Sequence, residues 1–208
     1  MEWHRSDAQS LRLIDQEMAD HGLAPAEYEV LRRVIYATGD FDYGACLYFS
    51  PQALAAGAAA LAARTTIVVD VPMVQVGITP MLQSRFANPV YCSMEALTRP
   101  QRGKSQTAWG METLAQRYPE AIFVVGTAEP ALAALVDLIE RGEVQPALVV
   151  GTPAAFLDGV GLKGRLRHTP VAQVTVEGIK GGATVATAVM EGLIDLAWQA
   201  YHQEAPST

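Results

Sequence analysis

The sequence is poor in cysteine, in positive charge and in long apolar runs, and each shortage excludes a class of protein. Its two cysteines, Cys46 and Cys92, lie far apart and in no metal-ligand spacing, which favours reduced, structural thiols in a cytoplasmic protein. Fifteen lysines and arginines against 22 aspartates and glutamates give a formal net charge of −7, which argues against non-specific nucleic-acid binding. No apolar run approaches the roughly 18 residues that cross a bilayer, and the N-terminal residues lack the form of a signal peptide. We therefore expect a cytoplasmic protein with neither nucleic-acid nor membrane partners.

Motifs for metals and common cofactors are also scarce. The four histidines lie in polar or terminal contexts, and no pair of them has metal-ligand spacing. No serine lies in a nucleophile elbow, and no phosphate-binding loop is present. Residues 159–164 fit the pattern G-x-G-x-x-G, but the run comes late and does not directly follow a strand, so we reject a dinucleotide site. The sequence therefore predicts no metal and no cofactor.

The remaining pattern is that of one globular α/β domain, residues 1–208. Half of the residues are apolar and 18% are charged, which is enough for a substantial core. The first 63 residues read as helical, and helices are also expected at 104–117, 128–141 and 182–201. Strands are expected at 65–70, 89–92, 121–126, 147–151 and 171–177. This order predicts an open, mostly parallel, five-stranded doubly wound sheet preceded by an N-terminal helical segment.

In such sheets ligands bind beyond the carboxyl ends of the strands. The first of these ends carries Asp70, followed by Met73 and Gly77. Taken alone, this run is a loop in which the aspartate caps the next segment and the glycine makes a turn. A functional interpretation is that Gly77 lets the backbone approach a flat ligand while Met73 offers a soft apolar surface.

Two further loops combine positive charge with the start of a helix. Arg102 and Lys104 precede Gln106 and Thr107, and this loop is either a solvated charged segment or a docking site for ligand carboxylates. The run 178–184 contains Lys180 and adjacent glycines before the last helix. A glycine turn of this kind is common, yet it also makes a good anion cradle.

Taken together, these segments resemble the precorrin-8X methylmutases, also called cobalt-precorrin-8 methylmutases, of corrin biosynthesis. The ordered signatures run from about Ser10 to the last helix, nearly the whole chain. They are Ser10 in the first helix, Ala37-Thr38-Gly39, the run 70–78, Gly126 with Ala128 and Leu132, and Lys180-Gly181-Gly182. So many signatures in register are hard to obtain by chance.

The resemblance implies a flavodoxin-like sheet and a homodimer with the site at its interface. It also implies a cofactor-independent shift of a methyl group from C11 to C12 of the macrocycle, which gives hydrogenobyrinic or cobyrinic acid. The substrate-binding residues that it implies are Ser10, Asp70, Met73, Gly77, Arg102, Lys104, Gln106, Thr107, Gly126, Lys180, Gly181 and Gly182.

Three positions depart from the family's pattern. Tyr36 occupies the place of the catalytic histidine, Gln106 that of the arginine in a Thr-Arg-Ser motif, and Glu177 a place where arginine is frequent. A phenol has a reference pKa of about 10 against about 6.5 for imidazole, so it is the weaker acid near neutrality. It can nevertheless donate a hydrogen bond to a ring nitrogen or a developing charge.

We therefore predict Tyr36 as the catalytic residue of a working methylmutase. Three alternatives stay open at this point. The chain is an isomerase of a different tetrapyrrole, or a tetrapyrrole-binding protein that has lost catalysis, or Tyr36 is a packed aromatic with no chemical role.

Overall fold

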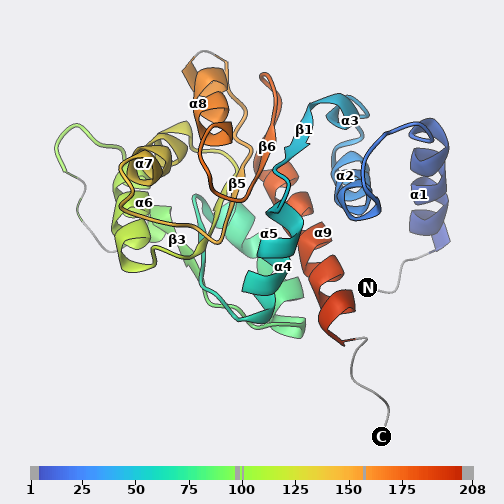
Figure 1. Ribbon diagram of the computed structural model, residues 1–208, viewed down its shortest axis with the longest axis horizontal. Coiled ribbons are helices and arrows are strands. Elements are labelled where there is room, and N and C mark those ends of the chain that lie inside the picture. Colours follow the sequence, from blue (N-terminus) through green and yellow to red (C-terminus); the bar gives the residue numbers. More distant parts are fainter. Residues whose placement is uncertain (1–4, 97–98, 100, 157, 203–208) are drawn as a thin grey trace, which may run out of the picture.

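An open sheet of parallel strands with one antiparallel edge organises the molecule (Figure 1). The computed structural model describes residues 5–96, 99, 101–156 and 158–202. In these residues six strands form one sheet in the order β1-β6-β5-β4-β2-β3. The strands are β1 Leu47–Phe49, β2 Ile67–Val69, β3 Val90–Cys92, β4 Ile122–Val125, β5 Leu148–Gly151 and β6 Gln173–Val176. The five parallel strands, β2 to β6, have the chain order 2-1-3-4-5, which is the order of flavodoxin-like sheets.

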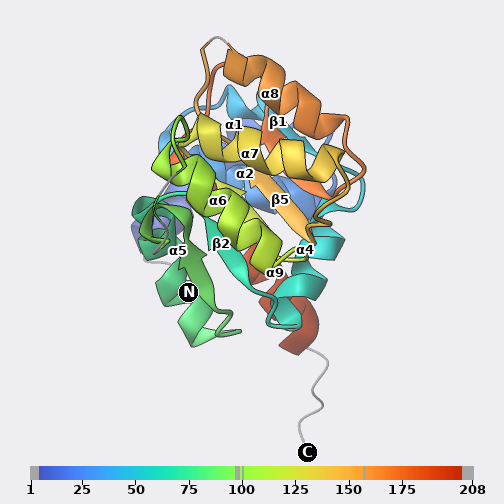
Figure 2. The same ribbon diagram turned by 90° about the vertical axis from the view of Figure 1, so that its left-hand side faces the viewer.

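Helices cover both faces of this sheet. They are α1 Arg5–Glu17, α2 Pro25–Thr38, α3 Tyr43–Cys46, α4 Ala53–Ala62, α5 Pro72–Ser84, α6 Gln106–Arg117, α7 Glu129–Glu140, α8 Asp158–Arg167 and α9 Ala183–His202, with a 3₁₀ turn at Ser93–Glu95. Helices α6, α7 and α8 lie on one face, in front in Figure 2, and α2, α4, α5 and α9 lie on the other. Helix α1 packs against α2, away from the sheet. Among the described helices, none has both the length and the apolar character needed to cross a bilayer.

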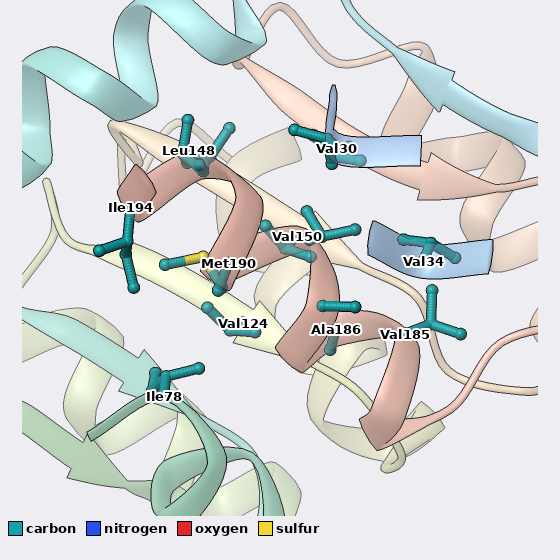
Figure 3. Packing of buried hydrophobic residues seen from close by; sticks show 14 of the residues in the cluster. Val30, Val34, Ile78, Val124, Leu148, Val150, Val185, Ala186, Met190 and Ile194 are labelled. Carbon is teal, nitrogen blue, oxygen red and sulfur yellow. The ribbon is translucent and has the colours of Figure 1, made fainter. Parts of the chain in front are cut away.

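The core consists of two apolar layers, one on each face. In β4, Ile122 and Val124 face one layer while Phe123 and Val125 face the other, because side chains alternate along a strand. Figure 3 shows the layer beneath α9, where Met190 lies beside Val124 and Val150. Burial on both faces explains why the strands are nearly continuous apolar runs.

The prediction of five strands was wrong by one. Residues 47–49 form β1, which pairs antiparallel with β6, so the first 63 residues are not helical throughout. A strand of three residues that directly follows a short helix has too little alternation to be recognised, and it forms because it completes the sheet edge.

Two helices were also missed. Helix α5 occupies the run that follows Asp70, and it contains both Gly77 and Pro80, which weaken a helical pattern. Helix α8 contains the glycines of the G-x-G-x-x-G run. The five predicted parallel strands and the other predicted helices are present, with ends that differ by a few residues.

Candidate active site

Asp70 joins three strand ends at the point where the strand order reverses. Its side chain is fully buried, and its carboxylate accepts hydrogen bonds from the backbone N–H groups of Gly126 (3.1 Å), Thr127 (2.7 Å) and Ala128 (2.7 Å). Its carbonyl oxygen accepts a bond of 2.9 Å from the Ser93 hydroxyl. A carboxylate at the start of α7 also interacts favourably with the helix dipole. Asp70 is therefore a buried residue that connects the segments after β2, β3 and β4 at the carboxyl end of the sheet.

Gly77 and Gly126 allow close packing around α9. A Cβ atom on Gly77 would lie 2.6 Å from Cγ2 of Thr187, and one on Gly126 would lie 2.9 Å from Cα of Ala183. Gly77 therefore lets α5 pack close to α9. The structure gives this glycine a role in helix packing, in place of the expected role in admitting a ligand. Met73, in the first turn of α5, is 68% exposed, and Val76 in the next turn is 71% exposed, so both face outward.

The glycine turn between β6 and α9 contacts the loop that follows β5. Gly181 has φ 148°, and a Cβ atom there would lie 2.2 Å from the carbonyl oxygen of Thr152. The Gly182 N–H donates to the same oxygen at 2.7 Å, so this amide is not presented to an anion, as a cradle would require.

Lys180 is held by two carboxylates from the loop after α2. Its Nζ lies 2.6 Å from Asp40 Oδ2 and 2.7 Å from Asp42 Oδ2. Hydrogen bonds to Asp40 and then Asp42 raise the pKa of the Lys180 ammonium. The two ion pairs connect the end of α2 to the end of β6, and the lysine charge is compensated within the protein.

Tyr36 lies in the last turn of α2, with its side chain 40% exposed. Gly39 ends that helix in the left-handed conformation at φ 67°, and its N–H donates to the carbonyl of Ile35 at 2.8 Å. The Tyr36 hydroxyl donates to Asp7 Oδ1 at 2.9 Å. This hydrogen bond is the largest cause that raises the pKa of Tyr36 above its usual value. Ser10 lies one turn beyond Asp7 on α1 and is half-buried.

The basic loop before α6 lies at the same end of the sheet. Arg102 and Lys104 are exposed, and Lys104 Nζ lies 2.5 Å from Glu112 Oε2. Gln106 Nε2 donates to the carbonyl of Ala96 at 3.2 Å, which ties the start of α6 to the loop after β3. The Thr107 hydroxyl lies 3.2 Å from that of Ser105. The loop combines exposed cations with an anchored helix start.

Exposed apolar side chains gather at this end of the sheet. Met73 and Met94 follow β2 and β3, while Phe156 and Ile179 follow β5 and β6 and are 74% and 52% exposed. The last two loops are joined, because the Ala155 N–H donates to the carbonyl of Ile179 at 3.0 Å. Such a group of exposed apolar side chains is typical of a binding surface.

Sequence reasoning missed four charged residues at this end. They are Asp7, Asp40 and Asp42, which bind Tyr36 and Lys180, and Lys163 on α8, which is 2% exposed. The carboxylates carry no signal in the sequence because their partners are distant in the chain. Leu162 and Leu166, spaced for one face of a helix, could have revealed α8 and the buried position beside them.

Some crevices of the molecule lie away from these residues. One of about 660 Å³ lies between the C-terminal ends of α7 and α8, beside Ile139, Gly142 and His168. It is at the opposite end of the sheet, because both helices start at the carboxyl ends of strands. Among the described residues, no group of three or more His, Cys, Asp or Glu is placed to hold a metal ion.

Comparison with known proteins links the chain to one family. The family model of precorrin-8X methylmutase matches residues 7–196. A cobalt-precorrin-8 methylmutase of Synechocystis sp. is 38% identical over 205 residues, which cover 92% of this chain and 94% of the relative. A precorrin-8X methylmutase of Pseudomonas aeruginosa is 35% identical over 178 residues, which cover 81% and 84%.

The fold is similar to that of solved structures. A precorrin-8X methylmutase from Thermus thermophilus superposes with a TM-score of 0.85 at 36% identity, over 95% of this chain and 99% of that chain. A precorrin-8X methylmutase related protein gives a TM-score of 0.78 at 25% identity, over 89% and 99%. The fold similarity therefore extends over most of the chain.

Proposed function

The chain belongs to the precorrin-8X methylmutase family, and from that membership we propose how it works. It is a methylmutase isomerase of cobalamin biosynthesis whose substrate is precorrin-8X or cobalt-precorrin-8. The reaction moves a methyl group from C11 to C12 of the macrocycle and gives hydrogenobyrinic or cobyrinic acid. The reaction needs no external methyl donor, because the methyl group stays on the same molecule.

One observation carries the assignment to a site. The family's signature segments meet at the carboxyl end of the parallel sheet, and exposed apolar side chains lie among them. Met73, Met94, Phe156 and Ile179 offer apolar surface to the faces of the macrocycle. This is also the end at which doubly wound sheets bind ligands.

Tyr36 takes the place of the family's histidine as the group that contacts the ring. In the structure, its hydroxyl donates to Asp7. Rotation about the C–O bond allows the same hydrogen to be donated to a ring nitrogen near pyrrole C, where it favours the methyl shift. Asp7 raises the pKa of the phenol and so keeps it in the protonated form that can donate.

The ligand's carboxylates dock at the basic loop before α6. Arg102 and Lys104 are exposed there; Lys104 pairs with Glu112, whereas the Lys180 ammonium is held by both Asp40 and Asp42. Gln106 occupies the position of the family's arginine. Its side chain anchors the start of α6 and does not bind a ligand carboxylate. Arg102, like Arg99 of the same loop, has a guanidinium group that can offer a bidentate contact.

The assembly is a homodimer whose partner subunit covers part of the open site, and we expect it to act in the cytoplasm. The exposed apolar side chains at the carboxyl end supply surface for such a contact as well as for the ligand.

A second candidate is a tetrapyrrole carrier without turnover. It is favoured by one observation, that the Tyr36 proton is already engaged by Asp7. A carrier binds the product tightly but does not accelerate its formation.

Incubation of purified protein with precorrin-8X separates the two candidates. A methylmutase converts the substrate over many turnovers, and the absorption spectrum changes to that of the orange product. Protein that binds hydrogenobyrinic acid in an equilibrium titration yet shows no conversion is a carrier, and that result would refute the proposed activity.

A further inference from the structure

Lys163 is a buried cation whose hydrogen-bond partners are carbonyl groups. Its side chain is 2% exposed, and its Nζ donates to the carbonyl oxygens of Pro153 (3.3 Å) and Lys180 (3.0 Å). Among the described residues, no carboxylate lies within ion-pair distance of it, and Glu129 acts on it only at longer range. Burial lowers the pKa of this ammonium because removal from water disfavours the charged form. A charge that is costly to bury needs a structural or functional reason.

The two carbonyl groups belong to two different loops of the site. Pro153 follows β5 and Lys180 follows β6. The same loops are joined by the Gly182 N–H, which donates to Thr152 at 2.7 Å, and by the Ala155 N–H, which donates to Ile179 at 3.0 Å. Lys163 therefore adds a third connection, made by a side chain from α8 that lies beneath both loops.

The outer side of these loops carries the groups that face the ligand. Phe156 and Ile179 are exposed, and the Lys180 side chain extends to Asp40 and Asp42. Fixing the Lys180 carbonyl fixes the start of that side chain. The positive charge of Lys163 also lies below the same surface, where little solvent screens it.

We propose that Lys163 is a positioning residue of this site, which holds the two loops together and favours a ligand that carries carboxylates above them. The claim that Lys163 favours a carboxylate ligand rests on the proposed function, because it concerns the macrocycle. The claim that Lys163 holds the two loops together rests on the hydrogen bonds alone and can be judged without the ligand.

Two substitutions separate the roles of the hydrogen bonds and of the charge. Lys163→Met keeps most of the length of the side chain but removes both, while Lys163→Gln removes the charge and keeps an N–H donor on a side chain that is one bond shorter. Arg165→Met is the matched control, because Arg165 lies on the same helix, is 45% exposed and pairs with Asp137 and Glu140 on the surface.

The readouts are amide hydrogen exchange at Ala155 and Gly182 and the steady-state constants with precorrin-8X. Lys163→Met should speed exchange of both amides and raise KM by about tenfold, which corresponds to about 1.4 kcal/mol, with a smaller change in kcat. Lys163→Gln should keep most of the amide protection and still raise KM. Arg165→Met should leave all of these values unchanged.

Unchanged exchange and KM in Lys163→Met would overturn the proposal. If Lys163→Met does not fold, Lys163→Gln provides the test. A KM equal to that of the unmodified protein would show that the buried charge does not assist binding, and the claim that Lys163 favours a carboxylate ligand would fail. If the unmodified protein converts no precorrin-8X, the proposed function fails instead, while the exchange data still judge the role of Lys163 in joining the loops.

Discussion

Tyr36 and Asp7 form a pair in which the carboxylate controls the acidity of the phenol. The hydroxyl donates to Asp7 Oδ1 at 2.9 Å, and this hydrogen bond raises the pKa of Tyr36. The protonated phenol is therefore present up to a higher pH than it would be in water. If the protonated form donates to the ring, the activity lost on ionisation of Tyr36 is lost at a correspondingly higher pH.

We predict that Asp7→Asn lowers the pKa of Tyr36. An amide carries no charge and accepts a weaker hydrogen bond, so the phenolate is less disfavoured. The alkaline limb of the pH profile of kcat/KM, which reports the free enzyme in which Tyr36 donates to Asp7, should move to lower pH. Ultraviolet difference titration against Tyr36→Phe isolates the Tyr36 phenolate. A Tyr36 pKa that does not change in Asp7→Asn would mean that the pair does not form in solution.

Gly181 is a glycine of the site whose replacement should be costly. Its φ of 148° is rarely adopted by other residues, and a Cβ atom would meet the Thr152 carbonyl oxygen at 2.2 Å. We predict that Gly181→Ala lowers the free energy of unfolding by about 3 kcal/mol and separates the loops after β5 and β6.

Urea unfolding measures this loss, and Gly161→Ala is the control. Gly161 lies within α8, and a Cβ atom there meets nothing within 4 Å. Alanine should therefore stabilise the protein by about 0.5–1 kcal/mol at position 161. Equal urea midpoints for the two variants would show that the close approach at Gly181 is relieved at little cost.

At the scale of elements, one carboxylate on α9 connects α2 to the end of α5. Asp195 contacts the guanidinium groups of Arg33 and Arg85, and all three side chains are nearly buried, at 12–13% exposure. We predict that Asp195→Asn lowers the free energy of unfolding by about 3–5 kcal/mol, because two guanidinium groups lose their buried partner.

Asp137→Asn is the matched control for this ion pair. Asp137 pairs with Arg165 on the surface, so the same chemical change there should cost less than about 1 kcal/mol. Urea unfolding of both variants checks the difference. Equal urea midpoints for the two variants would show that Asp195 contributes no more than a surface ion pair.

The elements that the sequence predicted are those with a strong local pattern. The strands around 67–69 and 122–125 are continuous apolar runs buried on both faces, and α9 has a long helical repeat. In contrast, β1 has three residues, and α5 and α8 contain glycines or a proline that obscure their periodicity. Their formation depends on packing against the sheet, which no local pattern records.

The end of the sheet at which the candidate site residues lie was also predictable, but the contacts of these residues were not. Ligand sites of doubly wound sheets follow from topology, so Met73 and Lys180 were expected at one end. The partners of Tyr36 and Lys180 lie 29 and 140 residues away in the chain, and an aspartate gives no sign of such a partner. Lys163 was missed because a lysine is rarely buried.

For the whole molecule, we predict a homodimer. The exposed apolar side chains at the carboxyl end of the sheet include Met73, Met94 and Phe156, and a partner subunit would shield them when no ligand is bound. A stable interface of this kind buries about 1,200–2,000 Å² in total. Sedimentation velocity over a range of micromolar concentrations should give the mass of a dimer. A single species with the mass of one chain would refute this prediction.

The central claim is that the chain isomerises precorrin-8X at the end of the sheet where Tyr36 lies, with the phenol as the donor to the ring. Tyr36→Phe tests it most directly, because it removes one hydroxyl and keeps the ring and its packing. We predict that kcat falls about a hundredfold while the affinity for hydrogenobyrinic acid changes little, and that Tyr36→His, with the better proton donor near neutrality, keeps or raises the rate. A Tyr36→Phe variant that turns over precorrin-8X at the unmodified rate would contradict the account.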